Sequence, residues 1–296
     1  MIVCAAANPS IDRLFEVETL VPGAIHRPRQ YAQVAGGKGL NVARAAATLG
    51  ADVTAVAILA GNAGRWVAQE LDRAGVACEL HWVDGETRSS LSVADRSGDG
   101  LTEFYERGVE VPDDAWLRFA RSVDRLSAGA SWLTVSGSLP PGVPPGGYRM
   151  FEPACACAAD TTADRPAGTA LVKLNAAEAA AVTGVATGTA DGALAAADVL
   201  RSAGAVGVVT RGAEGAVLVG EDGSALVGRL DARGRYPVGS GDSFLAGLVV
   251  ARAAGADWVD ALRLALGAAA ANAAEFGAGR FERVEAERLA GRATVS

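Results

Sequence analysis

The stretch YPVGSGDSFLAGL, residues 236–248, places a carboxylate where the chain turns into an apolar helix. Gly239, Ser240 and Gly241 form a turn that can present several backbone amides at the start of that helix, and such an arrangement favours an anion. Asp242 would then lie beside the anion, where a carboxylate can accept the proton of a hydroxyl group during phosphoryl transfer. The alternative is a helix N-cap, which stabilises a helix by about 1 kcal/mol. Taken alone the stretch slightly favours the cap, although a cap does not need glycine on both sides of Ser240.

A second glycine cluster, AGGKGLNVARA, leads into a helix that begins near Leu40. Glycines such as Gly37 let a ligand approach the backbone closely, and Lys38 can contact a phosphate as a point charge. The cluster is not a P-loop, because the pattern GxxxxGK followed by Ser or Thr is absent from the chain. A glycine turn with a solvated lysine is an equally good interpretation of this cluster alone.

Polar residues follow four expected strands at the points where those strands end. They are Asn8 and Asp12 after the first strand, Ser136, Gly137 and Ser138 after SWLTV, Lys173, Asn175 and Glu178 near the end of ALVKLN, and Thr210, Arg211 and Gly212 after VGVV. In a parallel sheet covered by helices, ligands bind outside the carboxyl ends of the strands. Each group alone could be a cap or a turn, but together they predict a binding site at one edge of the sheet.

Arg88 and Glu103 lie in a segment that alternates polar and apolar residues. A cross-strand charge pair is the first interpretation of these two residues. The alternative is that they reach a sugar phosphate.

Composition excludes several classes of protein. The chain has 296 residues, half of them hydrophobic, and a net charge of −7, which argues against a general nucleic-acid binder. The four cysteines are expected to be reduced, and no metal-binding pattern of cysteine or histidine occurs. Neither a secretory signal nor a membrane-spanning run is recognisable, so we expect a cytoplasmic protein with no membrane partner.

Short apolar runs alternate with Ala- and Leu-rich helical patterns and predict a mostly parallel sheet with helices on both faces. The expected strands are 1–7, 52–60, 131–138, 170–175, 205–212 and 215–220, and the expected helices are 39–50, 64–75, 176–184, 191–204, 243–254 and 257–277. Residues 10–35 and 82–110 lack this rhythm and predict antiparallel strands outside the main sheet, with a turn at Ser97–Gly100. No linker divides the chain, so a single domain over 1–296 with a small β lid is expected.

Six segments, in this order along nearly the whole chain, resemble the PfkB/ribokinase superfamily of sugar kinases: NPSID, GGKGLNVARA, SGSLPPGVP, KLNAAE, VVTRGAEGAVL and VGSGDSFLAGL. The resemblance implies a ribokinase-like fold, which is a Rossmann-like three-layer α/β/α sandwich with a β lid. It also implies ATP-dependent phosphorylation of a sugar hydroxyl with Mg²⁺, and a homodimer formed through the lid.

The resemblance assigns a role to each matching residue. Asp242 corresponds to the catalytic base, and the turn before it corresponds to the anion hole. The positions implied to bind the sugar are Asp12, Gly37, Lys38, Asn41, Arg88, Glu103 and Ser138. The positions implied to bind the nucleotide are Lys173, Asn175, Glu178, Thr210, Gly212, Gly215 and Asn272, with Glu178 reaching the metal indirectly through Mg-ATP and Asn272 near the adenine.

Within the family, NPSID, GGKG, Arg88 in TRSSLSV and Glu103 in LTEF resemble the branch that acts on phosphorylated ketohexoses, which includes 1-phosphofructokinase and tagatose-6-phosphate kinase. Fructose 1-phosphate is the acceptor we expect, and tagatose 6-phosphate and fructose 6-phosphate are the alternatives. Lys38 and Arg88 would hold the phosphate already present on the sugar.

The chain also departs from the family pattern. The span between SGSLPPG and KLN is short, which implies lost helices, thin cover for part of the sheet, and a strand remnant ending at Asp160. Pro237 stands where a hydroxyl residue is common. Two rival functions stay open: a non-catalytic binder of sugar phosphates or nucleotides, and a dinucleotide oxidoreductase, although no GxGxxG follows the first strand.

Overall fold

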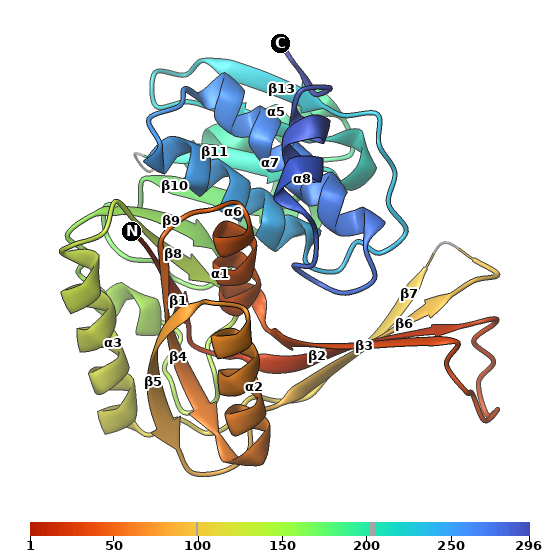
Figure 1. Ribbon diagram of the computed structural model, residues 1–296. Coiled ribbons are helices and arrows are strands. Elements are labelled where there is room, and N and C mark those ends of the chain that lie inside the picture. The colour runs from red at the N-terminus through yellow and green to blue at the C-terminus, as the bar shows by residue number, and fades with distance from the viewer. Residues whose placement is uncertain (99, 202–204) are drawn as a thin grey trace.

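The computed structural model describes residues 1–98, 100–201 and 205–296 and shows a layered α/β protein with a small sheet beside it (Figure 1). The strands are β1 Ile2–Ala6, β2 Ser10–Val17, β3 Gln30–Gly36, β4 Val53–Ala60, β5 Ala77–Val83, β6 Ser89–Asp95, β7 Leu101–Tyr105, β8 Trp132–Ser136, β9 Ala156–Asp160, β10 Leu171–Asn175, β11 Val206–Thr210, β12 Ala216–Val219, β13 Ala225–Arg229 and β14 Thr294–Val295. The α-helices are α1 Lys38–Thr48, α2 Gly61–Arg73, α3 Asp113–Ser127, α4 Ala176–Thr183, α5 Ala190–Arg201, α6 Ser240–Ala253, α7 Trp258–Ala274 and α8 Arg283–Ala290. Within the described residues, the chain also forms 3₁₀ turns at Gly147–Met150 and Gly212–Glu214.

The large sheet has ten strands in the order β14-β13-β12-β11-β10-β9-β8-β1-β4-β5. The pairs from β5 to β11 are parallel, and β12, β13 and β14 extend the sheet in antiparallel fashion. The chain leaves β1 toward β4 on one side and returns to β8 on the other, so the strand order reverses between β1 and β8. A crevice at the carboxyl ends of the strands is expected at such a reversal.

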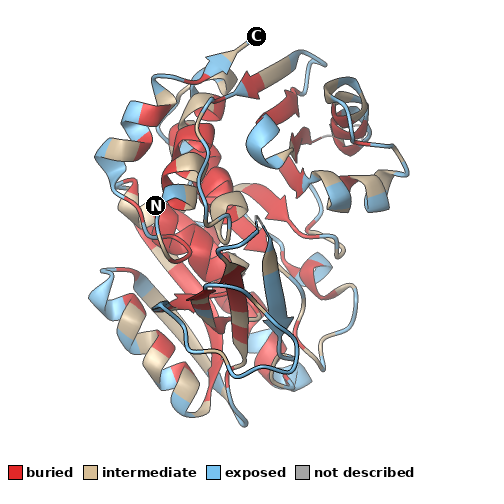
Figure 2. Cartoon of the chain, turned by 90° about the vertical axis from the view of Figure 1, so that its right-hand side faces the viewer, coloured by how far each residue is buried: buried red, intermediate tan, exposed pale blue. Residues whose placement is uncertain are grey.

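Alternate residues of each central strand face opposite helix layers, because strand side chains have a period of two. In β1, Ile2, Cys4 and Ala6 join the core under α1, α2, α6, α7 and α8, whereas Val3 and Ala5 join the core under α3. A third core joins α4 and α5 to β10, β11 and β12. Figure 2 shows the buried residues running through these strands and the inner faces of the helices. The predicted three-layer sandwich is therefore confirmed.

A separate sheet of four strands, called the small sheet below, has the order β3-β2-β6-β7. It projects from the body of the molecule in Figure 1. Strand β2 pairs antiparallel with β3 and parallel with β6, and β6 pairs antiparallel with β7. The sequence predicted strands outside the main sheet in these segments, but it placed residues 82–83 there as well, and they belong to β5 of the large sheet. The prediction began the outer segment at residue 82, but strand β5 continues without a break from Ala77 to Val83 and is mostly half-buried.

The short span between β8 and β10 does not leave the sheet thinly covered, contrary to the prediction. Four aromatic rings fill this space: Trp116 and Phe119 of α3, and Tyr148 and Phe151 of the connection from β8 to β9. The rings of Trp116 and Phe151 are stacked at 5.6 Å. The strand ending at Asp160 is present as β9, and its small residues leave room for these rings. Aromatic packing therefore covers this part of the sheet.

Several elements had no counterpart in the sequence prediction, among them α3, β13, α8 and β14. Two predicted details fall partly outside the described residues: the turn Ser97–Gly100 includes residue 99, and the predicted helix 191–204 ends within residues 202–204. The cysteines are free, as expected. Within the described residues, no helix combines the length and apolarity needed to cross a membrane.

Candidate active site

The polar residues gather where the strand order reverses, at the carboxyl ends of the strands. Asn8 follows β1, Ser138 follows β8, and Asp160 ends β9. Two helices begin at the same place: α1 at Lys38 and α6 at Ser240. The elements therefore bring segments that are up to 234 residues apart in sequence, such as Asn8 and Asp242, to one edge of the sheet.

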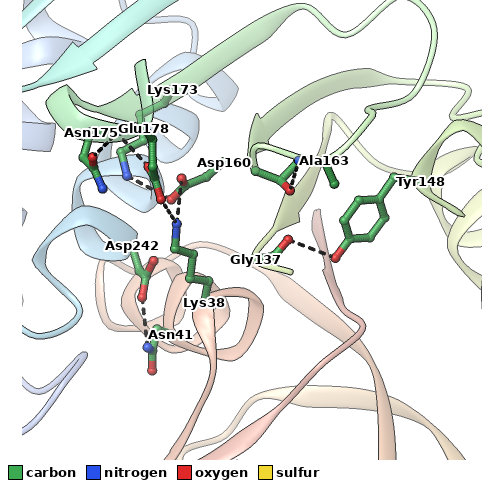
Figure 3. Close-up of polar contacts among 11 residues, drawn as sticks. Lys38, Asn41, Gly137, Tyr148, Asp160, Ala163, Lys173, Asn175, Glu178 and Asp242 are labelled. Atoms are coloured by element: carbon green, nitrogen blue, oxygen red, sulfur yellow. Dashed lines mark hydrogen bonds and ion pairs between the residues drawn. The ribbon is translucent and has the colours of Figure 1, made fainter. Parts of the chain in front are cut away.

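Asp242 lies in the first turn of α6 and is only 6% exposed. The Nδ2 atom of Asn41, from α1, donates a hydrogen bond of 2.9 Å to its Oδ2 atom. The side chain makes no capping bond to the helix amides, so the simple cap interpretation is wrong. Its carboxylate is instead turned toward α1 (Figure 3).

The electrostatic environment prepares Asp242 to hold and lose a proton near neutral pH. Burial raises the pKa of this carboxyl to about 7, and the charge of Asp160 adds to the effect, whereas Lys173, Lys38 and the Asn41 amide oppose it. A general base works best when its pKa lies near the working pH. Asp242 therefore has the protonation behaviour that base catalysis requires.

The start of α6 offers unpaired backbone amides beside this carboxylate. Gly239 precedes the helix with a φ of 77°, a left-handed conformation that glycine adopts without strain. The amide of Ser240, a member of the predicted anion hole, donates to the carbonyl of Pro237 at 3.0 Å. Among the described residues, the amides of Gly239, Gly241 and Asp242 have no such partner and are free to face an anion.

Two lysines and two carboxylates form a cluster next to Asp242 (Figure 3). The Asp160 carboxylate is fully buried and accepts hydrogen bonds from Lys173 Nζ at 2.9 Å and from Lys38 Nζ at 3.3 Å. Lys38 Nζ also donates to Glu178 Oε1 at 2.9 Å. The sequence assigned Lys38 to the sugar, but its ammonium group lies with the residues assigned to the nucleotide.

The charges in this cluster stabilise one another. Burial alone would raise the pKa of Asp160, but the ammonium groups of Lys173 and Lys38 outweigh burial and lower it. Burial likewise opposes the charge on Lys38, but the carboxylates of Asp160, Glu178 and Asp242 outweigh it and raise its pKa. Lys38 therefore stays cationic at neutral pH, and its side chain, which is 35% exposed, can meet an incoming phosphate.

On the other side of Asp242, Asp12 of β2 lies in a network of donors. Its carboxylate accepts hydrogen bonds from Ser90 Oγ at 2.6 Å, from the Gly37 amide at 3.2 Å and from Asn41 Nδ2 at 3.5 Å. Asn41 thus links Asp12 to Asp242. The structure brings these predicted sugar-binding residues together with the predicted base.

Arg88 and Ser138 meet through Asn8. Arg88 donates to the side-chain and backbone oxygens of Asn8 at 3.1 and 3.2 Å, and Asn8 Nδ2 donates to Ser138 Oγ at 3.2 Å. Glu103 bonds instead to Ser92 and Tyr105. The cross-strand pair of Arg88 and Glu103 is therefore wrong, because Arg88 precedes β6 and turns back toward β1.

A cavity of about 320 Å³ lies beyond Glu178, at the ends of β10 and β11. Its lining includes Asn175, Thr187, Gly188, Thr210, Arg211 and Gly212. Three of these were assigned to the nucleotide from the sequence, whereas Gly215 does not line the cavity and closes the 3₁₀ turn behind it. The cavity is adjacent to the capping box of α4, in which Asn175 and Glu178 bond to each other's backbone amides.

Asn272, which the sequence assigned to the nucleotide, does not line this cavity. It is fully buried, and its Nδ2 atom donates to the Val238 carbonyl at 2.8 Å and to Ser240 Oγ at 3.0 Å. Its Oδ1 atom accepts from the Gly279 amide at 2.6 Å. The side-chain amide thus joins the turn before α6 to the segment at Gly279, and it positions that turn.

The residues fit a metal ion that arrives with a nucleotide. Among the described residues, no three His, Cys, Asp or Glu side chains are grouped to hold a metal directly. Glu178 is partly exposed, and its two oxygens contact Lys38 and the Asn175 amide. A carboxylate in this position can accept hydrogen bonds from the water molecules that Mg²⁺ usually retains.

Sequence reasoning missed the roles of two buried residues in this site. Asp160 was recognised only as the end of a strand remnant, although a strand-end carboxylate is itself a signal. Arg44, three residues after Asn41 on α1, donates to Asn41 Oδ1 at 3.4 Å and to the carbonyls of Ala35 and Ala278. Burial lowers the pKa of Arg44 to about 10. No local pattern distinguished it from an ordinary helix-surface arginine.

Comparison with known proteins places this geometry in context. The model of the pfkB family of carbohydrate kinases matches residues 2–284. The chain is 33% identical to 1-phosphofructokinase of Haloferax volcanii over 280 residues, which cover 89% of this chain and 88% of that protein.

Two solved structures share the fold. One is a Thermotoga maritima protein described as a possible 1-phosphofructokinase, with a TM-score of 0.89, 22% identity, and coverage of 100% of this chain and 99% of that one. The other is phosphofructokinase-2 of Escherichia coli in complex with fructose-6-phosphate, with a TM-score of 0.87, 23% identity, and coverage of 98% of each chain.

Proposed function

This chain belongs to the pfkB family of carbohydrate kinases, and on that premise we propose that it transfers the γ-phosphoryl group of ATP to a hydroxyl group of fructose 1-phosphate. The observation that carries the proposal is Asp242, a buried carboxylate with a pKa raised to about 7 by burial, at the start of a helix with unpaired amides. The similarity to a 1-phosphofructokinase at 33% identity supports the choice of acceptor.

The acceptor sugar lies between the small sheet and the crevice. Asp12 and Asn41 hold its hydroxyl groups, and their links to each other and to Asp242 place the reactive hydroxyl beside the base. Arg88, anchored on Asn8, faces the phosphate that the sugar already carries. The small sheet acts as a lid that excludes water and limits hydrolysis of ATP.

Asp242 accepts the proton of the attacking hydroxyl as the new O–P bond forms and the bond to ADP breaks. The amides of Gly239, Gly241 and Asp242 stabilise the charge on the phosphoryl group during transfer. Lys38, between Asp242 and Glu178, adds a positive charge on the same side. Glu178 would hold the water shell of the Mg²⁺ ion that accompanies ATP, and that ion would neutralise phosphate charge.

The adenosine part of ATP extends into the cavity at the ends of β10 and β11. Thr210 and Gly212 line it, and Arg211 adds a cation that hydrogen-bonds to the Gly188 carbonyl at 3.5 Å. Lys173 and Glu178 lie between this cavity and the start of α6, and the triphosphate would pass along them.

An assay of ADP release tests this proposal. The wild-type protein is supplied with ATP, Mg²⁺ and, in turn, fructose 1-phosphate, fructose 6-phosphate and tagatose 6-phosphate, and we expect the highest kcat/KM with fructose 1-phosphate. Asp242→Asn should lower kcat by roughly 10²- to 10⁴-fold because the proton acceptor is lost. A thermal melt of the variant verifies that it folds.

Other outcomes decide between the alternatives. Preference for one of the other two sugars would change the acceptor but keep the reaction. Binding of ATP or sugar phosphate without any turnover would favour a non-catalytic binder, and an Asp242→Asn variant with wild-type activity would remove the assignment of the base.

A further inference from the structure

Glu16 of β2 is a buried carboxylate that the proposed reaction does not use. Only 1% of its surface is exposed. The hydroxyl group of Tyr236 donates a hydrogen bond of 2.7 Å to Glu16 Oε2, and Arg96 Nη1 donates one of 3.1 Å to Oε1. The Tyr236 hydrogen bond is the main reason why the pKa of Glu16 is lowered. A buried charge with this many donors is held in one position.

The inner face of the small sheet carries both Glu16 and the predicted sugar contact Asp12. The two are four residues apart in β2, so they lie on the same face, about 13 Å apart along the strand. Leu14 lies between them and packs with Ala32 and Ala94 against the rings of Tyr236 and Phe276. Displacement of Glu16 would therefore also displace Asp12.

Tyr236 belongs to the segment that leads into the start of α6. Its amide donates to the Ala273 carbonyl at 2.9 Å, and its ring contacts Phe276 edge-on at 5.0 Å. Two residues later, Val238 is held by Asn272. The segment is thus fixed on α7, six residues before Asp242, and it contacts Glu16 of the small sheet through the Tyr236 hydroxyl and through Arg235 Nε, which lies 3.8 Å from Glu16 Oε2.

We infer that Tyr236 is a positioning residue: its hydrogen bond to Glu16 holds the small sheet over the crevice, so that a sugar held by Asp12 reaches Asp242. This inference rests on the proposed function. It gives a role to a tyrosine that precedes the catalytic turn and that neither base catalysis nor the anion hole requires.

Tyr236→Phe removes only the hydroxyl group and keeps the ring packed on Phe276. It removes the hydrogen bond to Glu16 Oε2 and leaves that oxygen only the longer contact with Arg235 Nε at 3.8 Å, so we expect KM for the sugar phosphate to rise roughly ten-fold. More ADP should also be released per sugar phosphorylated, because water enters under a loosened sheet. Tyr31→Phe is the matched control, since Tyr31 lies on the outer face of the same sheet and bonds to Gln33.

Hydrogen exchange of the backbone amides gives a second readout. In Tyr236→Phe, residues 10–17 should exchange faster than in the wild type, and in Tyr31→Phe they should not. If KM, the ratio of ADP to product and the exchange of residues 10–17 all match the wild type, the inference is wrong. If the wild-type protein phosphorylates no sugar phosphate, the proposed function fails, and the exchange of residues 10–17 still decides whether Tyr236 holds the sheet.

Discussion

At the scale of the residue, the protonation of Asp242 is set by opposing neighbours. Burial and Asp160 raise its pKa to about 7, while Lys173 and Lys38 limit the rise. A base must be ionised to accept a proton, so its activity increases as the pH passes upward through its pKa. The same neighbours therefore set both the position of the base and the pH at which it works.

The acid limb of the pH profile tests this balance. We expect kcat/KM to be roughly ten-fold lower at about pH 6 than at about pH 8. Lys38→Gln should move the limb to higher pH, in addition to lowering kcat, because Lys38 lowers the pKa of Asp242. The measurement is a profile of initial rates at saturating ATP. A profile that is flat across neutral pH would exclude Asp242 as the titrating group.

Asp242 should also reduce the stability of the protein above neutral pH. Its folded-state pKa of about 7 is higher than its ordinary value, so the native state loses stability as the pH rises through the window from about 4 to 7. Asp242→Asn cannot ionise, and we expect its free energy of unfolding to exceed that of the wild type at pH 8 by about 2–4 kcal/mol.

Denaturant melts at pH 8 and pH 5 measure this difference. It should shrink as the pH falls, because the wild-type carboxyl then becomes neutral like the amide. An equal difference at both pH values would show that the asparagine acts through packing and not through charge.

The sequence indicated most of these residues, but not their partners. Asp242, Asp12 and Asn41 lie together as the family pattern implied. The pattern could not reveal that Asn272 supports the turn, since only the packing of α7 against that turn decides where its amide points. Hydrogen-bond partners of buried polar groups depend on tertiary geometry that local spacing does not contain.

At the scale of the element, the start of α6 depends on Gly239. Its φ of 77° costs other residues about 1–2 kcal/mol, and an added Cβ atom would lie 2.7 Å from the Cβ atom of Ala278. Gly184, at the end of α4, has a similar φ of 72°, but no atom lies within 4 Å of an added Cβ. A substitution at Gly184 would therefore introduce backbone strain alone, whereas one at Gly239 would introduce backbone strain and a steric clash.

Gly239→Ala and Gly184→Ala should both lose about 1–2 kcal/mol of stability to backbone strain. Gly239→Ala should lose more stability than Gly184→Ala because its new Cβ atom would clash with Ala278. Its kcat should fall at least ten-fold, because the backbone amides at the start of α6 would shift. Gly184→Ala should keep its activity. Chemical denaturation and the ADP-release assay measure both effects, and equal kcat values for the two variants would contradict a catalytic role of the turn.

Hydrophobic period predicted the strands and helices of the large sheet well, because those segments bury one or both faces. Helix α3 could have been predicted too, since Ala115, Trp116, Phe119, Ala120 and Val123 follow a helical period. The aromatic packing between β8 and β9 could not have been predicted. It joins α3 to a segment that is rich in proline and glycine and that has no helical or strand period in its hydrophobic residues.

At the scale of the whole molecule, the small sheet has one face turned to the crevice and one turned to solvent. The outer face carries Phe15, Tyr31 and Phe104, and Tyr31 and Phe104 are 59% and 58% exposed. We propose that this face pairs with the same face of a second copy, because exposed aromatic residues are typical of protein interfaces. The dimer expected from the family resemblance would form here.

Phe104→Asp should convert such a dimer to a monomer, because a charge would be buried in an apolar contact. Leu117→Asp is the control, since Leu117 is 40% exposed on α3, away from the small sheet. Sedimentation velocity distinguishes the two variants. A wild-type protein that sediments as a monomer at every concentration would contradict the proposal.

Because Asp242 is buried, the proton that it accepts in each turnover should not reach the solvent at once. Each turnover leaves one proton on a carboxyl group that is 6% exposed and faces Asn41. The crevice occupied by the product is its most direct route to water, so the proton and the product should leave together. A pH indicator in a rapid-mixing experiment would then report the departure of product and not the chemical step.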